Sequence, residues 1–86
     1  MTYEVEYTPD AIKGLKAASA EDRRRIKNKV TVYAGHPFAS HQWSKSLTGS
    51  PYTQIRQGSW RAILSLDTKG QRVIVLVVER RDQVYR

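Results

Sequence analysis

The sequence predicts an α+β fold in the order βααβββ, with two N-terminal helices packed on a mainly antiparallel sheet of four strands. Apolar residues recur at helical spacing between residues 9 and 35, and apolar stretches typical of strands lie before this region and after residue 51. The 86 residues have room for one domain, residues 1–86, with one modest core.

The first predicted strand covers residues 2–7. Tyr3, Val5 and Tyr7 point to one face, and Glu4 and Glu6 point to the other. This alternation is typical of a strand with one buried and one solvent-exposed face, so we expect both glutamates to be exposed.

A short helix is predicted from Pro9 to Ala18, with Thr8 as its N-cap and proline at its first position. Gly14 weakens this helix by about 1 kcal/mol relative to alanine. The positions expected to be buried recur at helical spacing: Ala11, Ile12, Leu15 and Ala18.

A second helix follows the capping pattern that begins at Ser19, and Gly35 and Pro37 end it. Its predicted buried stripe is Ile26, Val30, Tyr33 and Ala34. Its exposed face carries five cations: Arg23, Arg24, Arg25, Lys27 and Lys29. This face is either a solvated helix side or a binding surface for RNA and the ribosome, and the sequence leaves both readings open.

Residues 37–51 show no regular pattern and are expected to form a loop, which Trp43 and Leu47 anchor to the core. Three strands are predicted after this loop: Tyr52–Arg56, Trp60–Leu66 and Arg72–Val78.

Two turns connect these strands. Gly58 gives the first turn its backbone freedom, and the loop Asp67–Gly70 forms the second, with its glycine expected at a positive φ. The run from Val73 to Val78 is apolar on both faces, so it belongs inside the sheet with helices on at least one side.

The composition favours a polyanionic partner. The formal net charge is +7, from 15 Lys and Arg against 8 Asp and Glu, which makes nucleic acid the leading partner class. Cysteine is absent, so we predict neither a disulfide nor a thiolate metal site, and we expect no cofactor. No signal sequence or membrane span is evident, so we predict a cytoplasmic protein without a membrane partner.

Arginines gather at the ends of the predicted strands. Arg56 and Arg61 bracket the glycine turn, and Arg80, Arg81 and the near-terminal Tyr85 follow the last strand. Guanidinium groups bind phosphate oxygens in pairs and stay charged at any working pH. The cluster therefore suits a nucleic-acid backbone, and the alternative is a solvated basic sheet edge.

In four stretches the chain resembles the RelE/ParE superfamily of toxin–antitoxin toxins, in its RelE-like branch. These are Tyr7 to Ala11, Leu47-Thr48-Gly49, Arg56 to Arg61, and Arg80 to Arg86. The resemblance covers nearly the whole chain through the order and spacing of these pieces. It implies a small toxin domain similar in fold to microbial ribonucleases.

The resemblance also implies an activity. RelE-like toxins cleave messenger RNA in the ribosomal A site without a metal, by attack of a ribose 2′-OH on the adjacent phosphate. The residues implied for the active centre are Arg56, Arg61, Arg80 or Arg81, and Tyr85. For Tyr85 we expect stacking and orientation before proton transfer. The implied partners are a protein antitoxin, the ribosome with its mRNA, and operator DNA only through the antitoxin complex.

The chain departs from the RelE pattern where two lysines are expected, because Tyr52 and Gln54 stand there. Lys45 is the candidate to replace them. Val84 stands where other branches carry a histidine, and His41 is a weaker candidate for the site. The general base is not identified from the sequence.

Two other functions therefore remain open. A ParE-like inhibitor of DNA gyrase would have the same fold without RNA cleavage. A catalytically weak or degenerate toxin would act with its antitoxin as a transcriptional autorepressor.

Overall fold

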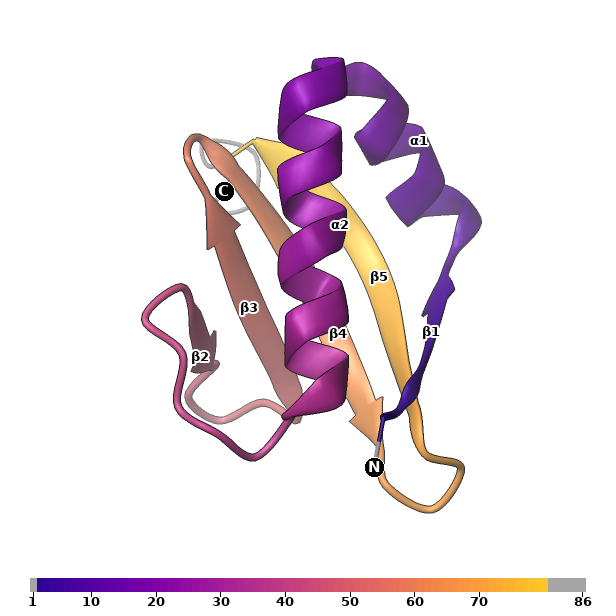
Figure 1. Ribbon diagram of the computed structural model, residues 1–86, viewed down its shortest axis with the longest axis vertical. Helices are drawn as coiled ribbons and strands as arrows, with labels where there is room; N and C mark the ends of the chain where they lie inside the picture. Colours follow the sequence, from indigo (N-terminus) through magenta and orange to yellow (C-terminus); the bar gives the residue numbers. More distant parts are fainter. Residues whose placement is uncertain (1, 81–86) are drawn as a thin grey trace.

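The computed structural model describes residues 2–80, which form two helices on one face of a five-stranded sheet (Figure 1). The elements are β1 (Glu4–Tyr7), α1 (Pro9–Ala17), α2 (Ala20–Gly35), β2 (Ser44–Ser46), β3 (Tyr52–Gln57), β4 (Trp60–Asp67) and β5 (Arg72–Arg80). The strand order is β1-β5-β4-β3-β2, in which β1 runs parallel to β5 and the other neighbours are antiparallel. The predicted α+β class and helix positions are confirmed.

The prediction of four strands was wrong by one, because the expected loop contains the short edge strand β2. Its sequence, Ser44-Lys45-Ser46, is polar throughout and carries no hydrophobic periodicity. It is a strand because it pairs with β3, where Lys45 lies opposite Gln54. Trp43 packs against the core beside it, as predicted.

Helix α1 lies unusually close to β5. A Cβ atom on Gly14 would stand 1.9 Å from the carbonyl oxygen of Val78, so only glycine allows this approach. The same junction is tied by Thr8, whose Oγ1 accepts the amide of Ala11 at 3.1 Å and donates to the carbonyl of Leu76 at 2.7 Å.

The core lies between the helices and the sheet. All four predicted residues of the second helix are buried: Ile26, Val30, Tyr33 and Ala34. In α1, Ala11 and Leu15 are buried, but Ile12 is 43% exposed, which corrects its predicted core position. Ile12 is exposed because a step of one residue rotates it about 100° from the face that Ala11 packs on the sheet.

The two predicted turns differ in outcome. Gly58 has a positive φ of 56°, as expected. In the second turn the left-handed residue is Gln71, with φ 55°, and not Gly70. Gly70 is small for another reason: the Asp67 carboxylate accepts its amide at 3.0 Å, and a Cβ there would lie 2.5 Å from Asp67 Oδ2. Within residues 2–80 no helix is long and apolar enough to cross a bilayer.

Candidate nucleic-acid interface

The sheet face opposite the helices carries the predicted arginines of the first turn. On β4, Trp60 and Ala62 are buried on the helix side, so Arg61 between them points to the other face. The strand register sets Arg56 opposite Arg61, and Arg61 opposite Glu79. One row of side chains therefore crosses β3, β4 and β5, next to the row that contains Lys45 and Gln54.

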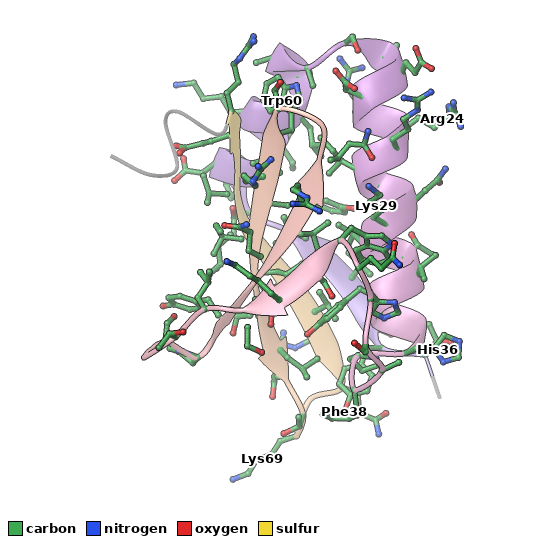
Figure 2. All side chains as sticks on the ribbon, turned by 90° about the vertical axis from the view of Figure 1, so that its left-hand side faces the viewer. Arg24, Lys29, His36, Phe38, Trp60 and Lys69 are labelled. Carbon is green, nitrogen blue, oxygen red and sulfur yellow. The ribbon has the colours of Figure 1, made fainter. Side chains whose placement is uncertain are left out.

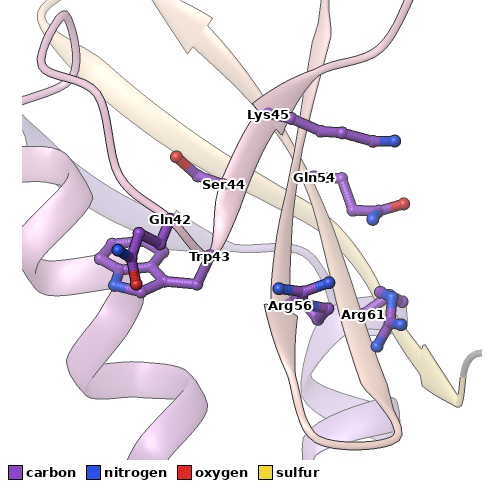
Figure 3. Close-up of a pocket in the computed structure, with 7 residues that line it drawn as sticks. All are labelled: Gln42, Trp43, Ser44, Lys45, Gln54, Arg56 and Arg61. Carbon is purple, nitrogen blue, oxygen red and sulfur yellow. The ribbon is translucent and has the colours of Figure 1, made fainter.

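A pocket of about 290 Å³ lies on this face. Its lining residues are Gln42, Trp43, Ser44, Lys45, Gln54, Arg56 and Arg61. Figure 3 shows Lys45, Gln54 and Arg61 reaching the same side of the strands, while Trp43 turns towards α2. The lining has three cations and no carboxylate, so its electrostatic character favours an anion.

Arg61 is the most buried cation of this pocket, with 5% of its surface exposed. Its Nη1 donates to the carbonyls of Gly58 and Trp60, each at 2.9 Å, and so holds the turn between β3 and β4. Its Nε is buried and has no hydrogen-bond partner among residues 2–80. Buried donors are nearly always paired, so this N–H is an exception within the described chain.

The backbone of Arg56 is held on both sides. Its amide donates to the carbonyl of Trp43 at 2.7 Å, and its carbonyl accepts Nζ of Lys29 at 3.0 Å. The Trp43 indole stacks on the His41 ring, with centroids 4.6 Å apart and planes 16° apart. Burial lowers the pKa of Lys29, and repulsion from the Arg56 and Arg25 guanidinium groups lowers it further.

The basic residues of α2 do not form one face, in contrast to the prediction. Arg23 turns back onto α1, where its guanidinium donates to the carbonyls of Leu15 at 2.9 Å and Ala18 at 3.1 Å. It therefore satisfies carbonyl groups at the end of that helix, which is a structural role.

The remaining cations of α2 point in three directions. The Lys27 ammonium lies 6.0 Å from the centroid of the Tyr7 ring, on the β1 side of the helix. Arg24 extends into solvent away from the sheet, whereas Lys29 lies between α2 and the strands (Figure 2). Arg25 forms an exposed ion pair with Glu21 at 2.5 Å.

Arg80, predicted to follow the last strand, is the final residue of β5 and does not line this pocket. Arg80 pairs with Trp60 across β4 and β5, and its guanidinium lies 5.8 Å from the centroid of that ring, on the helix side. Arg81 and Tyr85 lie outside the described residues. The structure thus brings together Lys45, Arg56 and Arg61.

Two residues of this face were not predicted as site residues, although Gln54 was noted where the RelE pattern has a lysine. Gln54 is 5% exposed in the pocket, and Glu79 stands beside Arg61 on the same face. Their positions depend on strand register, and β2 itself gave no hydrophobic signal. His41 lies outside the pocket lining, because its Nε2 donates to the carbonyl of His36 at 3.1 Å and its ring stacks on Trp43.

No group of three or more His, Asp or Glu side chains within residues 2–80 is arranged to hold a metal ion. The pocket can bind a phosphate through guanidinium and ammonium groups, and it can stabilise charge that develops on its oxygens.

Several solved structures of toxins and toxin–antitoxin complexes have a similar fold. A free form of the Escherichia coli toxin RelE, with two arginines changed to alanine, has a TM-score of 0.83 and 21% identity over 99% of this chain and 92% of that chain. A chain of the archaeal RelE–RelB complex from Pyrococcus horikoshii has a TM-score of 0.80 and 22% identity, covering 94% and 97%. A chain of the toxin–antitoxin complex RelBE2 from Mycobacterium tuberculosis has a TM-score of 0.79 and 19% identity, over 94% of this chain and 100% of that chain.

No protein-family model and no curated protein matches the sequence. The likeness is therefore one of structure, at sequence identities below a quarter. The α+β fold predicted from the RelE/ParE resemblance is confirmed, and the chain has the fold of the RelE toxins.

Proposed function

We propose that this protein is the toxin of a type II toxin–antitoxin system and cleaves messenger RNA on the ribosome. The observation that carries the proposal is the pocket in which Lys45, Arg56 and Arg61 meet without a carboxylate. It lies on a RelE fold, at the turn where RelE-like toxins are expected to bind the scissile phosphate.

The reaction needs no group beyond the RNA itself and proton carriers. The ribose 2′-oxygen forms a bond to the adjacent phosphorus as the bond from phosphorus to the 5′-oxygen breaks. The 2′-OH proton passes to a base, and the 5′-oxygen receives a proton from an acid. The products are a 2′,3′-cyclic phosphate and a free 5′-OH.

The chain offers a residue for each part of this reaction. Arg56 and Arg61 stabilise the negative charge that builds on the phosphate. The Lys45 ammonium gives a proton to the 5′-oxygen, because a guanidinium holds its protons too tightly for this role. Glu79, beside Arg61 on the same face, accepts the 2′-OH proton. The ribosome holds the messenger in a reactive geometry.

The proposal keeps Tyr85 as a stacking and orienting residue and Arg81 as a further phosphate ligand. Arg80 is left out because it lies against Trp60 on the helix side. The natural inhibitor is a protein antitoxin with an acidic or amphipathic segment, which suits the net charge of +7. The ribosome and its mRNA are the targets, and operator DNA is bound only through the antitoxin complex in the cytoplasm.

Primer extension on a defined messenger tests the proposal, with the purified chain and ribosomes whose A site is empty. We expect cuts with ribosomes and none on naked RNA. Arg56→Gln should slow cleavage by about 100-fold, because it removes one group that stabilises the transition state. Lys45→Gln should slow it by at least about 100-fold, because it removes the proton donor.

Lys69→Gln is the control of equal charge, since Lys69 is exposed in the turn between β4 and β5, far along the strands from the pocket. It should cleave like the unchanged chain. Absence of cleavage in every tube would contradict the nuclease. A supercoiling assay would then test the ParE-like alternative, gyrase inhibition.

A further inference from the structure

We infer that Lys29 forms a second phosphate subsite, which binds the phosphate next to the one in the pocket on the same RNA strand. The inference rests on the proposed function, because it takes an RNA strand to be the ligand. It assigns one residue of the basic helix to the interface and leaves its other cations out.

Lys29 is bound to the backbone of a residue that lines the pocket. Its Nζ donates to the carbonyl of Arg56 at 3.0 Å, and the side chain of Arg56 lines the pocket. The Lys29 ammonium on α2 is thus bound to the backbone of the residue whose guanidinium lines the pocket. We therefore place Lys29 next to Arg56 on the path of a strand that leaves the pocket.

Among residues 2–80, no ion pair balances the charge of Lys29. None of the three ion pairs within residues 2–80 includes Lys29, Arg56 or Lys45. The guanidinium groups of Arg56 and Arg25 repel the ammonium, which contributes to its lowered pKa. A phosphate bound here would relieve this repulsion, and an RNA strand carries such phosphates.

The Lys29 side chain is also ordered before any ligand binds. Its Nζ lies 5.9 Å from the centroid of the Trp43 ring, and the indole is itself stacked on His41. An ammonium group has three donors, and the bond to Arg56 uses one of them. Because the side chain is already held, little rotamer entropy is lost when a phosphate binds.

Lys27 provides a matched contrast two residues earlier on the same helix. Its ammonium lies over Tyr7 on the β1 side, so it is on the far side of α2 from Arg56. Lys27→Gln and Lys29→Gln remove the same charge from the same helix. A difference between them therefore reports location and not net charge.

The test uses the full chain and a labelled hexanucleotide whose 2′-O-methyl groups prevent cleavage. Anisotropy titrations over a range of salt give the affinity and its salt slope. We expect Lys29→Gln to weaken binding about tenfold at low salt and to reduce the slope by about 0.7, the loss of one phosphate contact. Lys27→Gln should change the affinity by less than about threefold and leave the slope unchanged.

A 2′-O-methyl dinucleotide with one phosphate separates the two possible roles of Lys29. If Lys29 binds its own phosphate, this probe should bind the Lys29→Gln chain as well as the unchanged chain. Weaker binding of this probe would mean that Lys29 only positions Arg56, and would overturn the inference. Thermal unfolding of each variant confirms that the fold is retained.

Other results would also overturn the subsite. Equal losses in Lys27→Gln and Lys29→Gln would show a general charge effect. Unchanged RNA binding together with weaker binding of an acidic peptide would assign Lys29 to a protein partner. If the unchanged chain does not cleave on ribosomes but the two probes bind as expected, only the proposed nuclease activity is contradicted. If neither probe binds, both the nuclease activity and the Lys29 subsite are contradicted.

Discussion

Arg61 and Glu79 lie opposite each other across β4 and β5, on the sheet face that the helices leave open. No ion pair joins them within the described chain, because the Arg61 guanidinium turns back to the carbonyls of Gly58 and Trp60. Glu79 is thus not ion-paired with its cross-strand neighbour, and it does not itself line the pocket. In the proposed reaction it accepts a proton next to the bound phosphate.

We predict that Glu79→Gln slows cleavage by about 100-fold or more, because the amide cannot accept the 2′-OH proton. Single-turnover cleavage on ribosomes measures this effect.

Glu4→Gln is the control for this prediction, because Glu4 is an exposed carboxylate at the β1 edge of the sheet. It should keep the cleavage rate of the unchanged chain. An unchanged rate in Glu79→Gln would assign the base to the ribosome or to another residue.

The long helix and strands were predictable because their apolar residues are spaced so that they lie on one buried face. The stripe of α2 and the alternation of β4 come directly from the positions of their apolar residues. Strand β2 was not predictable in this way, since its Ser-Lys-Ser sequence is fixed by backbone pairing with β3. Local pattern says nothing about such a partner.

The residues of the candidate site likewise divide into those that the local sequence predicts and those whose positions depend on strand register. Arg56 and Arg61 could be predicted because they flank one turn and pair directly across it. Lys45 was only a candidate until the register placed it opposite Gln54, and Glu79 required the register of β4 and β5. The prediction that the basic residues of α2 share one exposed face was wrong, because the charge of Arg23 does not show that its side chain binds the carbonyl groups at the end of α1.

Gly14 and Gly35 give a matched test of packing. Gly14→Ala should lower the free energy of unfolding by about 1–3 kcal/mol or more, because its methyl group would overlap the Val78 carbonyl and force α1 from β5. Gly35→Ala should be neutral or stabilising by up to about 1 kcal/mol, since nothing lies within 4 Å of the added methyl. Urea denaturation of the two variants measures the difference, and equal midpoints would contradict the close contact.

Asp67 should make stability depend on pH. The Gly70 amide and then the Arg72 guanidinium hold its pKa below the ordinary 3.8, so the folded state favours the carboxylate. This contribution is complete above the unfolded pKa and is lost as pH falls through the lowered folded value.

Asp67→Asn keeps an oxygen for the Gly70 amide but removes the charge that binds Arg72. The variant should therefore be less stable than the unchanged chain near neutral pH, and the gap should close at strongly acid pH. Thermal unfolding from neutral to acid pH measures this gap. High salt should reduce the part due to Arg72, because the pair is partly exposed. A gap that does not change with pH would show that the carboxylate contributes nothing through its charge.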